Sequence, residues 1–75
     1  LLNDKFDIIF MDPPYKEKKL PFLLNAITKL ELLNKDGIII IHRHKKEDDD
    51  LPKEFNLILE KNYGISKIIF GNILT

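Results

Sequence analysis

The apolar segment Phe6–Met11, followed at once by Asp12-Pro13-Pro14, restricts the fold more than any other part of the chain. Its residues favour β-strands, and only Asp7 interrupts their apolar character. Such nearly continuous hydrophobicity is typical of parallel strands that are covered on both faces. Because proline cannot donate a backbone hydrogen bond to a neighbouring strand, the two prolines end this one abruptly. We predict a buried strand over residues 6–11, with Asp7 paired or at the end of the sheet.

A helical pattern follows the charged loop Tyr15–Lys19. Apolar residues recur at spacings that place them on one stripe of a helix, namely Leu20, Leu23, Leu24, Ile27 and Leu30. Pro21 suits the first turn, where its missing N–H is not needed. The pattern predicts a helix from Leu20 to about Asn34, and Gly37 is expected to end it in the left-handed conformation.

A second strand is expected over Ile38–Ile41, extending to His42. Strand, helix and strand with short connections form a βαβ unit, which is parallel and right-handed. Residues 42–50 carry clustered charges of both signs and predict a solvated loop. Asn56–Lys61 and Ser66–Phe70 are then two β-prone segments, and Asn62-Tyr63-Gly64 between them predicts the turn of an antiparallel hairpin.

The predicted elements place the chain in the α/β class and leave one face of its sheet uncovered. The helix covers one face, whereas the first two strands have the composition of strands covered on both. We therefore interpret residues 1–75 as part of one domain, half of a doubly wound sheet whose other strands and helices are N-terminal. The N-terminal half of that domain is then a partner of this chain, and we expect the isolated chain to be inactive.

Composition excludes several classes of protein. The 75 residues contain no cysteine, which excludes disulfides and thiolate metal sites and suits a reducing, cytoplasmic compartment. Twelve basic and twelve acidic residues cancel, which excludes a globally basic nucleic-acid binder but not a local patch. No apolar run is longer than Ile38–Ile41, which is far too short to cross a bilayer, so no membrane association is expected.

The motif Asp12-Pro13-Pro14-Tyr15 lies where ligands bind in open α/β sheets, at the carboxyl end of a strand. The prolines restrict the backbone, so that the carboxylate of Asp12 and the carbonyl of Pro13 form a rigid set of acceptors. Such a set suits an exocyclic amine with two N–H donors, on whose ring Tyr15 would stack. Acceptors on that amine stabilise the positive charge that develops as a methyl group arrives in line. The alternative interpretation of residues 12–15 is a purely structural turn after a strand.

Residues 6–15 resemble motif IV of S-adenosylmethionine-dependent amino-methyltransferases. Residues 60–64, Glu-Lys-Asn-Tyr-Gly, with the β-run after them, resemble the last hairpin of the RsmD-type 16S rRNA guanine-N2 methyltransferases. The resemblance covers essentially the whole chain. It implies the C-terminal half of a Rossmann-like methyltransferase sheet that methylates a guanine N2 in 16S rRNA or the small ribosomal subunit. The implied role is rRNA methylation and processing in the cytoplasm.

The resemblance also assigns roles to the motif residues. Asp12 and the carbonyl of Pro13 would hold the target amine, Pro14 would keep the loop rigid, and Tyr15 would stack on the flipped base. Asp12 would also border the S-adenosylmethionine site. The glycine-rich cofactor loop is not found in these residues, and by the resemblance it lies upstream.

Basic residues near the motif are candidates for RNA contacts, although a solvated surface is the favoured interpretation. These candidates are Lys16, Lys18, Lys19, His42 and Arg43. His42-Arg43-His44 stands where many members of the resembled family have an acidic residue, which puts any acidic role there in doubt. The two histidines lack a convincing third ligand, so we predict no metal site.

Two other functions are compatible with the motif. A DNA adenine-N6 or cytosine-N4 methyltransferase uses the same acceptors, but the hairpin that closes the chain leaves no room here for a DNA-reading domain. A truncated, non-catalytic module that binds RNA or a partner protein is the third interpretation.

Overall fold

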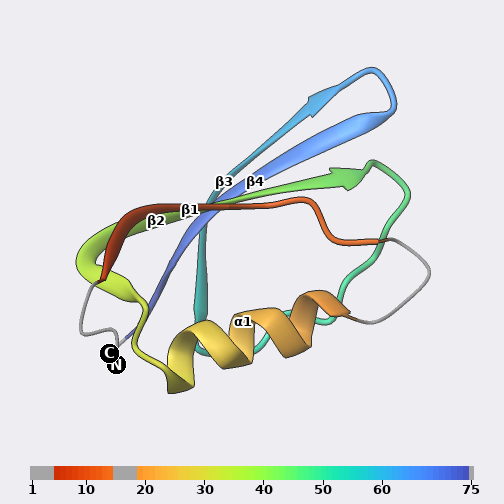
Figure 1. Ribbon diagram of the computed structural model, residues 1–75. Coiled ribbons are helices and arrows are strands. Elements are labelled where there is room, and N and C mark those ends of the chain that lie inside the picture. Colours follow the sequence, from red (N-terminus) through yellow and green to blue (C-terminus); the bar gives the residue numbers. More distant parts are fainter. Residues whose placement is uncertain (1–4, 15–18, 75) are drawn as a thin grey trace.

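The computed structural model describes residues 5–14 and 19–74. Its elements are β1 (Phe6–Met11), α1 (Lys19–Lys29), β2 (Leu33–His44), β3 (Phe55–Tyr63) and β4 (Ser66–Ile73). The strands form one mixed sheet in the order β1-β2-β4-β3, and α1 lies against one face of it (Figure 1). No helix within the described ranges is long and apolar enough to cross a membrane.

The predicted βαβ unit and hairpin are both present. β1 and β2 are parallel, with Ile8 opposite Ile38 and Met11 opposite Ile41. β4 pairs antiparallel with both β2 and β3. The carboxyl ends of β1 and β2 therefore lie together, on the right in Figure 1.

The helix ends earlier than its apolar pattern predicts. α1 stops at Lys29, and Glu31 adopts a φ of 51°. The N–H of Leu32 donates to the carbonyl of Ile27 at 3.1 Å, and the N–H of Glu31 donates to that of Thr28 at 3.2 Å. These two bonds are the Schellman pattern, which satisfies the last carbonyls of a helix.

Gly37 was wrongly predicted as the helix-ending residue, because it lies inside β2. It is buried, and a Cβ atom there would stand 2.6 Å from a side-chain carbon of Leu33. Pairing of β2 with β1 begins at Leu33, opposite Phe6, so the strand extends well before Ile38. Glycine is needed here for close packing.

The hairpin turn is also shorter than predicted. Tyr63 still pairs with Ser66, so that only Gly64 and Ile65 form the turn. Gly64 has a φ of 55°. A glycine with positive φ at the first of two turn positions is the feature of a type II′ hairpin, whose twist matches that of the strands.

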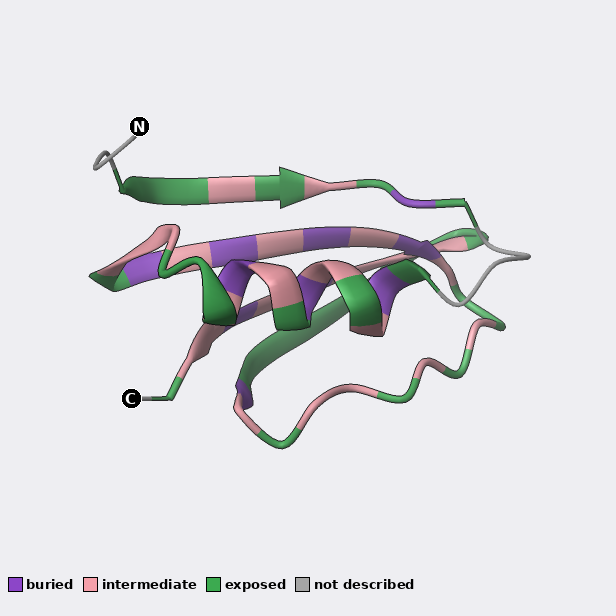
Figure 2. Ribbon diagram, turned by 60° about the horizontal axis from the view of Figure 1, so that its bottom comes forward, coloured by how far each residue is buried: buried purple, intermediate pink, exposed green. Residues whose placement is uncertain are grey.

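The hydrophobic core lies between α1 and the sheet. Its buried members are Leu20, Leu24, Ile27, Ile39, Ile41, Phe55 and Ile69. Burial alternates along β2, as Figure 2 shows, because successive side chains of a strand point to opposite faces.

The opposite face of β1 is exposed, so within this chain the strand is not buried on both faces as predicted. Ile8 is 65% exposed and Phe10 is 63% exposed, because no described element covers that face. Asp7 is paired, as expected, since the side-chain amide of Asn34 donates to its Oδ1 at 2.7 Å.

Candidate active site

The described part of the motif, residues 12–14, follows β1 and lies beside the end of β2. Met11 is opposite Ile41, so Asp12 comes level with His42. The Oδ1 atom of Asp12 is 3.1 Å from Nδ1 of His42. Tyr15, Lys16 and Lys18, for which we expect roles in stacking and phosphate binding, lie outside the described residues.

Asp12 is the exposed member of this pair. Its side chain is 55% exposed, against 28% for His42. The Oδ1 atom of Asp12 is bonded to His42, and no described residue donates to its Oδ2 atom. Among the described residues, the carboxylate therefore keeps one oxygen without a donor, at the carboxyl end of the sheet.

His42 also contacts the neighbouring strand on its other side. Its Nε2 atom is 3.0 Å from Oγ of Ser66, the first residue of β4. An ionised carboxylate only accepts hydrogen bonds, so the pair with Asp12 places the imidazole proton on Nδ1. In the neutral imidazole, Nε2 then accepts from the hydroxyl of Ser66. The three side chains form one continuous hydrogen-bonded chain across the end of the sheet.

Arg43 points to the opposite face of β2, toward α1, and is only 1% exposed. Its Nε and Nη2 atoms donate to the two carboxylate oxygens of Asp49 at 2.8 and 2.6 Å. Its Nη1 atom donates to the carbonyl oxygen of Pro13 at 2.9 Å. A buried guanidinium needs such partners, because an unpaired charge away from water is very costly.

These contacts change two of the roles expected from the sequence. Arg43 has a buried guanidinium that faces Asp49 and Pro13, so it presents no exposed group to an RNA phosphate. The carbonyl of Pro13, expected to accept from a target amine, already accepts from Arg43 and keeps one further lone pair. Pro14 is exposed beside it.

Asp49 and Ser66 are site residues that sequence reasoning missed. The acidic run before Pro52 was interpreted as facing solvent, yet Asp49 is only 12% exposed because it pairs with Arg43. The one available signal was an acidic cluster a few residues after the lone arginine. No sequence signal connects Ser66 with His42, because the contact depends on the pairing of β4 with β2.

Of the remaining candidates for RNA contacts, Lys19 lies within the described residues. Lys19 is exposed at the first position of α1. No group of three or more His, Asp or Glu side chains that could hold a metal ion occurs among residues 5–14 and 19–74.

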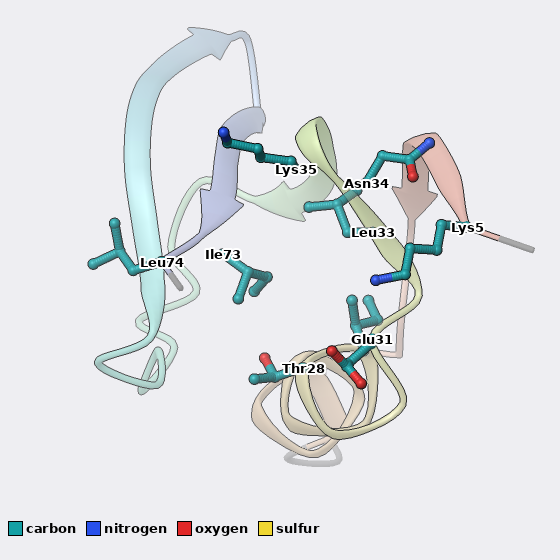
Figure 3. A pocket seen from close by; sticks show the side chains of 9 residues that line it. Lys5, Thr28, Glu31, Leu33, Asn34, Lys35, Ile73 and Leu74 are labelled. Atoms are coloured by element: carbon teal, nitrogen blue, oxygen red, sulfur yellow. The ribbon is translucent and has the colours of Figure 1, made fainter. Parts of the chain in front are cut away.

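A pocket of about 260 Å³ lies at the other end of the sheet (Figure 3). Its lining comes from the end of α1, the start of β2 and the end of β4, and includes Thr28, Glu31, Leu33 and Ile73. None of the described motif residues, 12–14, lines it. Because open α/β sheets bind ligands at the carboxyl ends of their strands, the candidate site is the motif end.

Three curated proteins have related sequences. An uncharacterized methylase of Rickettsia prowazekii is 37% identical over 67 residues, which are 89% of this chain and 28% of that protein. YlbH of Bacillus subtilis, described as a candidate rRNA methyltransferase, is 34% identical over 80% of this chain and 33% of its own length. The ribosomal RNA small subunit methyltransferase D of Buchnera aphidicola is 32% identical over 79% of this chain and 31% of its own length. The chain thus spans about a third of these relatives.

Solved structures share the fold. A protein from Haemophilus influenzae, described as a candidate methylase, superposes with a TM-score of 0.78 and 22% identity, over 96% of this chain and 45% of that one. The protein yhhF of Escherichia coli, described as a candidate methyltransferase, has a TM-score of 0.78 and 19% identity, over 96% of this chain and 41% of its own. A conserved hypothetical protein of Streptococcus pyogenes has a TM-score of 0.76 and 31% identity, over 95% of this chain and 46% of its own.

A family model assigns the chain as a whole. The model of the family described as Conserved hypothetical protein 95 matches residues 2–72. Together with the relative named ribosomal RNA small subunit methyltransferase D, this match confirms the resemblance carried by the motif and the last hairpin. The chain belongs to the Conserved hypothetical protein 95 family, whose members are RsmD-like.

Proposed function

We propose that this chain is the target-amine half of an S-adenosylmethionine-dependent rRNA methyltransferase domain, with Asp12 as its central acceptor. The observation that carries the proposal is the exposed carboxylate of Asp12 at the carboxyl end of β1, whose Oδ2 receives no hydrogen bond from the described residues. Two relatives, YlbH and the small subunit methyltransferase D, are named as a candidate rRNA methyltransferase and an rRNA methyltransferase, which supports the reaction and the class of substrate.

Asp12 would act on the amine through its charge and its lone pairs. The lone pair of an exocyclic amine is conjugated with its ring, and an acceptor on its hydrogens favours the geometry that frees it. As the new N–C bond forms and the S–C bond of the donor breaks, positive charge develops on the nitrogen. A fixed carboxylate stabilises that charge. The nitrogen then loses a proton and becomes a neutral secondary amine.

S-adenosylmethionine would supply the electrophilic methyl group on its sulfonium. The exposed carboxylate of Asp12 fits a neighbouring cation of that kind. No glycine-rich loop of the kind that approaches a nucleotide cofactor occurs in the sequence. The rest of the cofactor site would therefore belong to the N-terminal half of the domain.

The exposed apolar face supports that completed domain. Ile8 and Phe10 project from β1 on the side away from α1. Large apolar side chains gathered on one face of a sheet indicate a surface that is covered in the functional protein. Helices of the N-terminal half would cover it, which would complete a doubly wound Rossmann-like sheet.

The finer substrate assignment is guanine N2 in 16S rRNA, as naked RNA or in the small ribosomal subunit, methylated in the cytoplasm. It rests on the likeness of residues 60–64 to the RsmD-type hairpin and on the relative named small subunit methyltransferase D. Tyr15 would stack on the base. Lys16, Lys18 and Lys19 would contact phosphates beside it.

The test is labelled methyl transfer by the complete protein to rRNA, ribosomal subunits and DNA, with nucleoside analysis of the product. N2-methylguanosine in RNA is the expected product. N6-methyladenine or N4-methylcytosine in DNA would overturn the substrate assignment. The Asp12→Ala variant should lose orders of magnitude in kcat. Asp48→Ala, which changes an exposed acidic residue in the loop after β2, should leave kcat unchanged. Normal turnover by Asp12→Ala would overturn the role of the motif.

A further inference from the structure

We propose that His42 is a positioning residue that fixes the carboxylate of Asp12 and thereby selects Oδ2 as the oxygen that receives the target amine. The inference rests on the proposed function. It assigns a reason for histidine at the end of β2 that neither the motif nor the family match supplies.

The first step is the orientation of Asp12. Proline at position 13 restricts the backbone of Asp12 to extended geometry, but it leaves the side chain free to turn. The bond from Nδ1 of His42 to Oδ1, at 3.1 Å, favours one orientation of the carboxylate. Backbone and carboxylate are then both oriented before the substrate arrives, which is what an in-line transfer requires.

The second step is the orientation of His42 itself. Its ring is held at both nitrogens, by Asp12 on one side and by Ser66 at 3.0 Å on the other. The bond to Ser66 is partly buried, whereas the bond to Asp12 lies at the exposed end of the ring. Because the partners come from the loop after β1 and from β4, the position of the ring depends on the sheet as a whole.

The exposure of Asp12 and Ser66 shows which of these two side chains can face a substrate. Aspartate, histidine and serine bonded in this order also form the catalytic group of serine hydrolases, in which the aspartate is buried and the serine faces the substrate. Here the order of exposure is reversed. Asp12 is 55% exposed and Ser66 is partly buried, so the open end is the carboxylate. The arrangement therefore orients Asp12 and does not activate Ser66.

The experiment compares two variants of His42 whose amide nitrogen replaces one or the other nitrogen of the imidazole ring. In His42→Asn the amide N–H takes approximately the place of Nδ1, so the bond to Asp12 is kept. In His42→Gln the amide N–H takes approximately the place of Nε2, so the bond to Asp12 is lost. Methyl transfer is measured with the complete protein, as kcat and as KM for RNA and for S-adenosylmethionine. His44→Ala is the matched control, since His44 lies on the same face and contacts the backbone N–H of Lys46.

We expect His42→Gln and His42→Ala to lower kcat by about ten- to a hundredfold, since a displacement of about 1 Å in a reacting group has effects of that size. Both KM values should change little. His42→Asn should recover most of the lost kcat, and His44→Ala should retain it.

Three results would overturn the inference while leaving the proposed function in place. One is an inactive Asp12→Ala beside a fully active His42→Ala. Another is an equal loss of kcat in the Asn and Gln variants. The third is a loss that follows only the melting temperature. An active Asp12→Ala would instead contradict the proposed function itself, so the two failures are distinguishable.

Discussion

The guanidinium of Arg43 donates a hydrogen bond from inside the protein to the carbonyl oxygen of Pro13, at 2.9 Å. The two residues are 30 positions apart in the chain. With the neighbouring bond from His42 to Asp12, two consecutive residues of β2 hold two consecutive residues of the motif, from opposite faces of the sheet. The end of β2 thus supports the motif loop.

Loss of Asp49 should destabilise the protein strongly. Asp49→Ala would remove the bidentate partner of the buried charge of Arg43 and leave it the longer contact with Glu47, at 3.6 Å. Removing one member of a buried pair costs about 3–5 kcal/mol in the free energy of unfolding. Asp50→Ala, an exposed neighbour, should change that free energy by less than about 0.5 kcal/mol. Urea denaturation of the complete protein measures both, and similar values for the two variants would contradict the role of the pair.

Lysine should not replace Arg43. Arg43→Lys keeps the charge but loses the planar group that reaches both oxygens of Asp49 and the carbonyl of Pro13. We expect the free energy of unfolding to fall by about 1–3 kcal/mol, as for a buried acceptor left without its donor. Methyl transfer should fall as well, because the loop after β1 loses its inner support. A variant with wild-type stability and kcat would show that charge alone is sufficient.

A side chain at position 71 should disturb the packing of β4 against Phe55. A Cβ atom on Gly71 would stand 2.2 Å from the Phe55 ring and 2.6 Å from the carbonyl oxygen of Asn56. Gly71→Ala is therefore expected to cost about 1–3 kcal/mol of unfolding free energy, as overpacking does. Gly64→Asn is the control, since that turn position has open space and asparagine tolerates positive φ. Thermal or urea unfolding compares them, and equal stabilities would contradict the packing argument.

The exposed face of β1 should behave as a buried one in the complete protein. Phe10 is 63% exposed in this chain and Phe22, on α1, is 70% exposed. If the N-terminal half covers the sheet, Phe10→Asp should lower the free energy of unfolding by about 3 kcal/mol or more, because a large apolar group is lost and a charge is buried. Phe22→Asp should have a small effect. Matching small effects of the two variants would contradict coverage of this face.

The sequence by itself determined the order of strand, helix, strand and hairpin. It also determined the position of Asp12-Pro13-Pro14 at the end of a strand and the family. These features depend on neighbouring residues, since apolar period and proline geometry act over a few positions. The end of α1 was less predictable. The apolar stripe continues through Leu30, but pairing of Leu33 with Phe6 takes the following residues into β2.

Only the tertiary structure decided what holds the motif. Asp12 meets His42, and Ser66 meets the same ring, because β2 lies between β1 and β4 in a particular register. A shift of that register by one residue would exchange the faces of His42 and Arg43. The burial of Arg43 and Asp49 likewise depends on packing between α1, β2 and the loop that follows. Such contacts join residues distant in the chain, and local sequence patterns carry no information on which of them meet.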